Sequence, residues 1–522
     1  MDAVVNVLLI TTDQQRADSI GAYGNPVCQT PNLDRLAEQG TRFTACRTQN
    51  PFCQPARATI LTGTMPSTHG VTFNGRDLPE KEVGRSVATA FARAGYRTGF
   101  FGKAHFATTF PYLPSGKLES VEGSAAMDDD WTGPYFGFDH VQLLLFGHNL
   151  RTAPLMGRWN WCFGPAPFGL HYGRWLYRDG VANGNERLAA MQPEAAGAVW
   201  DRTQTWRSAI GEEHHPTTWT ADTAIDWLGD RAGGDEPFFG WVSFADPHHP
   251  MDPPGRWFDL YDPADVTEVL PEQRPGELDA KPPVHAIWSQ GAPPGGMFEW
   301  ANPGGASLSE ADLARMIAAY YGMVSQLDHN IGRILSALDR LGLADDTMVI
   351  MSTDHGEMLG DHRIIFKGPV HYEGLLRVPL IVRGPGVPAG ATATDPVGTI
   401  DLAPTMLAAA GVALPDHLEG APLFDGDGTP ATREHVVTED DFAALLEVPL
   451  RTITTDRYKL TAYLDAPGVG ELYDLHDDPG EFVNRWDDPA LAAVQSDLAA
   501  ALADRTVRVD PATALPSVGL VA

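Results

Sequence analysis

Cysteine is scarce in this sequence, with only four among 522 residues. So few cysteines do not make a disulfide framework. None of them forms the C-x-x-C pair that is typical of zinc sites or thioredoxin-like chemistry. A fold of this length must therefore be held by an ordinary hydrophobic core, for which a hydrophobic content of 43% is sufficient. The four are Cys28, Cys46, Cys53 and Cys162.

Basic residues and long hydrophobic runs are also few. Lys and Arg number 37 against 68 Asp and Glu, giving a net charge of −31. This balance argues against a nucleic-acid partner, because phosphate binding needs concentrated basic charge. No run of about 20 apolar residues suggests a membrane span, and the N-terminus "MDAVVNVLLITTDQQ" lacks the basic and apolar regions of a signal peptide. We therefore expect a cytoplasmic protein that has no membrane partner.

Apolar β-branched runs alternate with helical patterns along the chain. Strands are predicted at "VVNVLLITTD", "YRTGFFGK", "PFFGWVSFA" and "DTMVIMSTD". The alternation predicts an α/β fold, with a large, mostly parallel central sheet flanked by helices. We expect this domain to span residues 1–411, with insertions at about 110–215 and 251–306, and a smaller α+β subdomain to span residues 412–522.

Polar residues follow the predicted strands at the point where each strand ends. Ligand sites of open α/β sheets lie at the carboxyl ends of the strands, so we expect these residues to converge. Asp13, Gln14 and Asp354 offer oxygen ligands and His355 offers a nitrogen, a set that suits a hard divalent cation. The other polar residues at this edge are Lys103, His105 and His248.

Cys53 begins a predicted helix in "TQNPFCQPARATILTG". A buried structural thiol is the usual interpretation of a lone cysteine. A thiolate nucleophile is an alternative, because a helix N-terminus lowers a thiol pKa. A third is that Cys53 is the precursor of another group.

The segment "CQPAR", with Cys53, Pro55 and Arg57, resembles the C-x-P-x-R signature of the sulfatases, within the alkaline phosphatase-like superfamily. The resemblance implies an alkaline phosphatase-like fold and the oxidation of Cys53 to formylglycine (3-oxoalanine) by a formylglycine-generating enzyme. It extends over nearly the whole chain, through "NVLLITTDQQRAD", "GYRTGFFGKAH", "FADPHHP", "STDHGEMLGDH", "RVPLIVRGPG" and "ELYDLHDDPGEFVN".

The resemblance implies an arylsulfatase-like hydrolase acting on a small-molecule sulfate monoester. An aldehyde hydrate attacks sulfur with one hydroxyl, and deprotonation of the second then expels sulfate, which makes the covalent intermediate easy to resolve. By resemblance, Lys103 and Lys367 grip the sulfate, His105 is the base and His248 is the acid. Arg57 holds the hydrate, and Asn74 hydrogen-bonds substrate oxygens. The implied metal, Ca²⁺ first and Mn²⁺ or Mg²⁺ as alternatives, is bound by Asp13, Gln14, the modified Cys53, Asp354 and His355.

Two positions depart from the commoner sulfatase pattern. Gln14 and His355 resemble the phosphonate monoester and phosphodiester hydrolase branch, whereas the Lys103-x-His105 pair restores the sulfatase pattern. A phosphonate monoester or phosphodiester hydrolase is therefore an alternative. From a different class, a non-catalytic metal-binding protein that keeps Cys53 as a thiol is another. The acidic surface and apolar C-terminal tail are compatible with a homodimer or homotetramer.

Overall fold

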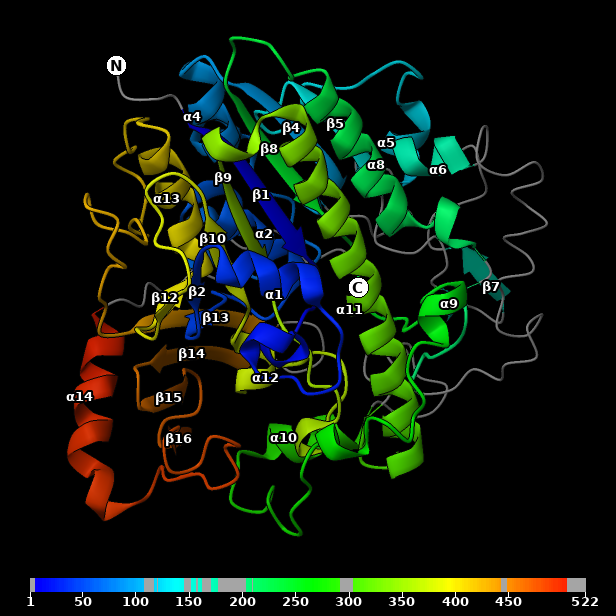
Figure 1. Cartoon of the computed structure of the whole chain (residues 1–522). Helices are drawn as coiled ribbons and strands as arrows, with labels where there is room; N and C mark the ends of the chain where they lie inside the picture. The colour runs from blue at the N-terminus through cyan, green and yellow to red at the C-terminus, as the bar shows by residue number, and fades with distance from the viewer. Residues whose placement is uncertain are drawn as a thin grey trace.

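The computed structural model describes residues 5–107, 117–119, 121–144, 152–155, 158–161, 170–176, 203–208, 210–291, 304–442 and 448–504. Within these residues an eight-stranded sheet forms the centre of the molecule, in the order β11-β2-β10-β9-β1-β8-β4-β5 (Figure 1). Its strands are β1 (Asn6–Thr12), β2 (Thr41–Phe43), β4 (Arg97–Lys103), β5 (His140–Leu144), β8 (Phe238–Ser243), β9 (Thr347–Thr353), β10 (Leu380–Arg383) and β11 (Ala391–Ala393).

The strands that carry the predicted site residues are parallel. β1 pairs with β8 and β9, and β4 pairs with β8, all in parallel register. β10 is the exception, because it runs antiparallel to both β2 and β9. The predicted α/β fold with a mostly parallel sheet is confirmed.

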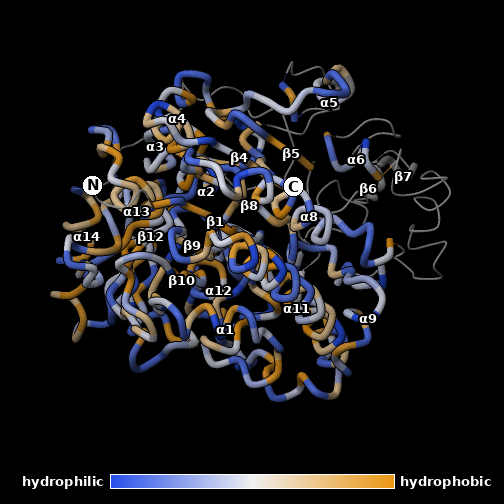
Figure 2. Tube along the Cα trace, turned by 45° about the horizontal axis from the view of Figure 1, so that its top comes forward, coloured by the Kyte–Doolittle hydropathy of each residue, from blue (hydrophilic) through white to orange (hydrophobic). Residues whose placement is uncertain are grey.

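Both faces of the sheet are covered by helices, as parallel sheets require. Alternate residues of β1 point to opposite faces, so Val7 and Leu9 join one hydrophobic cluster and Leu8 and Ile10 join the other. Figure 2 shows the hydrophobic colour running along β1 at the centre of the molecule. The first cluster includes residues of α2 (Cys53–Thr62), α4 (Val87–Arg93) and α13 (Leu402–Ala409), and the second includes residues of α1 (Pro31–Glu38), α8 (Pro216–Gly229) and α11 (Glu310–Leu341).

A separate four-stranded antiparallel sheet follows in the C-terminal part of the chain. It packs against α14 (Ala492–Ala503) around Ile453, Leu460 and Leu472. This is the predicted smaller α+β subdomain; the boundary near residue 411 stays a prediction. Its strands are β13 (Val436–Phe442), β14 (Val448–Thr454), β15 (Tyr458–Tyr463) and β16 (Gly470–Asp474).

The structure describes the two predicted insertions to different extents. Residues 251–291 contain two short α-helices, α9 (Gly255–Phe258) and α10 (Pro283–Gln290). The segment 110–215 is described only in part; Cys162 lies outside the described residues, as does the C-terminal tail. Among the residues described, no helix is both long enough and apolar enough to cross a membrane.

Candidate active site

Four neighbouring strands of the central sheet end at one group of polar side chains. Asp13 follows β1, Lys103 ends β4, His248 lies in the loop after β8, and Asp354 follows β9. The parallel register brings these ends to one edge, as the sequence predicts. Cys53 reaches the same place from the first turn of α2.

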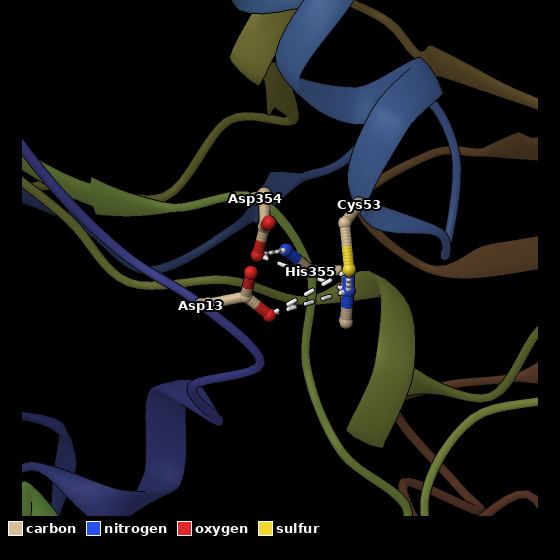
Figure 3. A group of neighbouring side chains, drawn as sticks. All are labelled: Asp13, Cys53, Asp354 and His355. Atoms are coloured by element: carbon tan, nitrogen blue, oxygen red, sulfur yellow. Dashed lines mark hydrogen bonds and ion pairs between the residues drawn. The ribbon is translucent and has the colours of Figure 1, made fainter. Parts of the chain in front are cut away.

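The predicted metal ligands form a compact cluster. One ligand atom from each of Asp13, Cys53, Asp354 and His355 lies within 4.8 Å of the others (Figure 3). The Cys53 Sγ is 3.2 Å from His355 Nε2 and 3.7 Å from Asp13 Oδ1. His355 uses Nδ1 against the Gly356 carbonyl at 2.8 Å, which leaves Nε2 directed at the cluster. Two carboxylates and one imidazole fit a divalent metal ion.

Gln14 contributes to this centre from a left-handed backbone conformation, with φ of 64°. Its Nε2 lies 2.9 Å from His249 Nδ1 and also donates to the carboxylate of Glu357. Its Oε1 accepts from Lys367 Nζ at 3.3 Å, so the amide oxygen faces the cluster. The geometry is compatible with the predicted ligand role of Gln14, and His249 is occupied in holding that amide.

Arg57 is buried and ties the cluster together. Its Nε donates to Asp354 Oδ2 at 2.8 Å, and its Nη2 donates to Asp13 Oδ2 at 3.0 Å. Its Nη1 donates at 2.6 Å to both the Lys103 carbonyl and Ser243 Oγ. Within the described residues its hydrogen bonds go to these four groups and none goes to Cys53. Arg57 therefore orients the metal-ligand carboxylates in this structure, a contact set that the sequence did not predict.

Two buried lysines flank the Cys53 sulfur. Lys367 Nζ lies 3.0 Å from Sγ, and Lys103 Nζ lies 3.9 Å from it. Burial and Asp13 raise the thiol pKa, but Lys103, Lys367 and His355 outweigh them and lower the pKa of Cys53 to about 7. Burial instead raises the pKa values of the other two free thiols in the described part of the chain, Cys28 and Cys46.

The two lysines differ in their counter-ions. Lys103 Nζ is 2.5 Å from Asp13 Oδ2. Lys367 Nζ has no carboxylate within 4 Å among the described residues; its partners are Cys53, His248 Nε2 at 3.0 Å, Gln14 and His355 Nε2 at 3.4 Å. A buried ammonium without a counter-ion is costly, and a bound anion would remove that cost.

Both predicted proton-transfer histidines are present beside the lysines. His248 directs Nδ1 at the His249 carbonyl at 2.6 Å and Nε2 at Lys367. His105 is buried, and burial together with Lys103 and Arg57 lowers its pKa well below the usual range. A neutral imidazole is the form that can take up a proton.

Asn74 contacts the helix that begins at Cys53. Its Oδ1 accepts from the Gln54 backbone N–H at 2.9 Å, and the next residue, Gly75, donates its N–H to Gln54 Oε1 at 2.5 Å. This contact satisfies an N-terminal backbone donor of α2. The predicted contact of Asn74 with substrate stays a prediction.

Glu119 is a neighbour that the sequence did not reveal. It is buried, and it accepts from the backbone N–H groups of His105 at 2.6 Å, Phe106 at 3.0 Å and Ala107 at 3.1 Å. It also accepts from Tyr135 Oη at 2.6 Å. These contacts hold His105 in a left-handed conformation with φ of 53°, which is unfavourable for a non-glycine residue. A single glutamate in a Gly- and Pro-rich segment has no sequence signal that would have identified it.

Comparisons with known proteins agree over nearly the whole chain. The family model described as Sulfatase matches residues 5–412, and a model described as N-sulphoglucosamine sulphohydrolase, C-terminal, matches residues 360–508. An arylsulfatase of Clostridium perfringens (strain 13 / Type A) is 29% identical over 498 residues, which cover 92% of this chain and 89% of the relative. The multifunctional alkaline phosphatase superfamily protein PehA of Trinickia caryophylli is 29% identical over 517 residues, which cover 95% and 93% of the two chains. The crystal structure of the phosphonate monoester hydrolase of Agrobacterium radiobacter has a TM-score of 0.76 and 28% identity, covering 96% of this chain and 95% of that one.

Proposed function

Because the chain belongs to the sulfatase family and is a sulfuric ester hydrolase, we propose that it cleaves an organic sulfate monoester with the oxidised side chain of Cys53 as nucleophile. The observation that supports this most is the buried Lys367 ammonium, which faces the Cys53 sulfur and has no carboxylate partner in the described part of the chain. A sulfate group bound there would supply the missing counter-charge.

The Cys53 sulfur stands in for a hydroxyl oxygen of the hydrated formylglycine. Asp13, Asp354 and His355 would hold the divalent metal, with Gln14 as a further oxygen ligand. Bound there, the metal would lower the pKa of that hydroxyl and make it nucleophilic near neutral pH. Ca²⁺ is the first choice for this oxygen-rich set, with Mn²⁺ and Mg²⁺ as alternatives.

The charged side chains of this chain would bind and orient the sulfate. Lys103 and Lys367 approach the nucleophile at 3.9 Å and 3.0 Å, so their ammonium groups can contact sulfate oxygens in both ground and transition states. Arg57 holds Asp13 and Asp354 in fixed orientations through ion pairs at 3.0 and 2.8 Å. Losing an orienting contact of this kind typically lowers metal affinity or activity by about 10–100-fold.

The two histidines would move protons on either side of the reaction. His248 Nε2 receives a hydrogen bond from Lys367 at 3.0 Å, so a proton can pass through His248 to the leaving alkoxide. His105, neutral because its pKa is lowered, would take the proton that must leave the nucleophile before sulfate is released. Asn74 would add a hydrogen bond to substrate oxygens.

A phosphonate monoester or phosphodiester hydrolase is the second candidate. Gln14 and His355 at the metal centre favour it, and so does the similarity to a phosphonate monoester hydrolase structure. A cationic pocket suits either monoanionic ester. The family match favours an enzyme over a non-catalytic metal-binding protein.

Two experiments test these proposals. The chain is expressed with a formylglycine-generating enzyme, its expected transient partner, and the peptide containing Cys53 is examined by mass spectrometry. An unmodified thiol in such a host would rule out the aldehyde mechanism. The purified enzyme is then assayed side by side on 4-nitrophenyl sulfate, an aryl phosphonate monoester and a phosphodiester; a preference for the phosphorus esters by orders of magnitude would favour the second candidate.

The cytoplasmic location and the homodimer or homotetramer stay predictions. Size-exclusion chromatography with light scattering measures the oligomeric state directly.

A further inference from the structure

Three consecutive acidic residues lie towards the end of β13. Glu439 accepts from the backbone N–H of Ser67 at 2.9 Å, and Asp441 is paired with Arg451 Nη1 at 2.7 Å. Asp440, between them, is fully buried, and neither of its carboxylate oxygens has a hydrogen-bond partner in the described part of the chain. Asp440 therefore differs from both neighbours, because neither oxygen of its carboxyl group makes a hydrogen bond within the described residues.

His371 faces Asp440 across a gap. Its Nε2 lies 3.9 Å from Asp440 Oδ2, which is too long for a hydrogen bond, and this nitrogen also has no partner among the residues described. Its Nδ1 is 2.6 Å from Thr452 Oγ1, so the ring is held in place from the other side. Three buried polar atoms, Asp440 Oδ1 and Oδ2 and His371 Nε2, thus lie near one another without a hydrogen bond to any described residue.

This group belongs to the surroundings of Cys53. The Asn50 side chain donates to the Glu439 carbonyl at 2.7 Å, and Asn50 lies just before α2. Thr438, on the same face of β13 as Asp440, donates to the Thr48 carbonyl at 2.7 Å, so this face is turned to the segment that leads to Cys53. His371 follows Lys367 in the same loop, between β9 and α12 (Glu373–Leu376).

Asp440 is as deeply buried as the side chains of the candidate active site. Asp440 and Cys53 both have an exposed fraction of 0%, and that of Lys367 is 3%. A buried polar atom without a partner is costly, and more so when it is charged, so each such atom calls for an explanation, of which a bound ligand is one. Burial and Asp441 also raise the pKa of Asp440 well above its usual range, as expected for a carboxyl group that lacks a partner.

We propose that Asp440 and His371 form a subsite that binds hydrogen-bond donors, hydroxyl or ammonium, on the alcohol portion of the sulfate ester. The proposal rests on the proposed sulfatase function. The two Asp440 oxygens accept from the donor groups of the substrate, and His371 Nε2 makes the third contact. Lys103 and Lys367 hold the sulfate end of the same molecule, so the subsite selects among esters without touching the sulfur.

The test compares three esters: 4-nitrophenyl sulfate, which has no donor on its alcohol portion, glucose 6-sulfate and 2-aminoethyl hydrogen sulfate. In Asp440→Asn we expect kcat/KM to fall about tenfold or more for one or both donor-bearing esters, while 4-nitrophenyl sulfate changes less than about threefold. The ester that loses more identifies the donor as hydroxyl or ammonium. Asp441→Asn, at the adjacent position and on the opposite face of the strand, is the matched control and should leave the ratio between esters unchanged.

Thermal unfolding separates a binding role from a structural one. Asp440→Asn removes no hydrogen bond that the described residues make, so the Tm should be unchanged or higher. A lowered Tm with an equal loss on all three esters would overturn the proposal, and so would wild-type activity on 4-nitrophenyl sulfate without activity on either donor-bearing ester. Absence of activity on every sulfate ester would instead refute the proposed function.

Discussion

Two groups of charged side chains in the described part of the protein are built differently. The Glu373 cluster, made of Arg47, Glu373, Lys459 and Glu481, joins the catalytic domain to the C-terminal sheet. Glu373 is 2.9 Å from Arg47 and 3.4 Å from Lys459, which also contacts Glu481. The Cys53 cluster is more deeply buried, and among the described residues it includes one cation, Lys367, with no carboxylate within 4 Å. Its members are Asp13, Cys53, Arg57, Lys103, Asp354, His355 and Lys367.

The way the charges are paired distinguishes a candidate active site from a network of structural ion pairs. Buried charge is present in both clusters, so burial alone identifies neither. In the Glu373 cluster the cations and carboxylates alternate and each meets an opposite charge, whereas in the Cys53 cluster Lys367 meets a thiol, two imidazoles and an amide. An ammonium group that has no carboxylate within 4 Å among the described residues, next to the proposed nucleophile, is the feature that predicts an anionic substrate.

The largest expected effect comes from Cys53, the proposed precursor of the nucleophile. Cys53→Ala should lower kcat/KM for 4-nitrophenyl sulfate by roughly 10⁴-fold or more, because no other group can form the covalent intermediate. Steady-state kinetics measure the loss. Cys28→Ala, at another buried free thiol, is the control and should retain activity; comparable loss in both variants would contradict the assignment.

The next largest effect is expected from a mutation in the Glu373 cluster. It should lower the stability of the protein and leave its activity unchanged. Lys459→Met leaves Glu373 and Glu481 buried with one cation fewer, so the free energy of unfolding should fall by about 3–5 kcal/mol. Denaturant unfolding measures this change, and kcat per folded molecule should stay near that of the wild type. Arg97→Met, which breaks an exposed pair with Glu236, is the control and should change stability little.

Lys367→Met should show the opposite pattern. We expect kcat/KM to fall by about 10²–10³-fold, because one cation aimed at the sulfate is removed. Stability should be unchanged or higher, because within the described residues the ammonium leaves no carboxylate partner behind. If Lys367→Met destabilised the protein as much as Lys459→Met, the distinction between the two clusters would be lost.

The smallest effect concerns the residue that positions His105. Glu119→Gln keeps the size of the side chain but replaces an acceptor oxygen with an NH₂ group that cannot accept the backbone N–H bonds. We expect kcat to fall about tenfold with little change in KM, since His105 would leave its left-handed conformation. Tyr135→Phe removes one of the four hydrogen bonds and should cost less. An unchanged kcat in Glu119→Gln would leave Glu119 with a structural role only.

Much of the fold and of the site could be predicted because local patterns determine them. Apolar runs ending at Asp13 and Asp354 identify parallel strands, and the ends of such strands must meet. Local sequence patterns do not show whether a strand pairs parallel or antiparallel, or which distant residues a side chain contacts. The short run of β10 gave no sign that it pairs antiparallel, and nothing near Arg57 indicated that its hydrogen bonds go to Asp13, Asp354, Lys103 and Ser243. Glu119, Asp440 and the Glu373 cluster depend on tertiary contacts between distant segments.

The contact between β13 and the segment before Cys53 also has a consequence for biosynthesis. Asn50 donates to a carbonyl 389 residues later in the chain, so this segment cannot reach its final position until most of the protein has been made. At ~5–20 residues per second, translation of that interval takes roughly 20–80 s. Once the contact forms, Cys53 has an exposed fraction of 0%. Under the proposed mechanism, the enzyme that converts Cys53 would have this interval in which to reach it, and faster folding or translation would leave more of the protein unconverted.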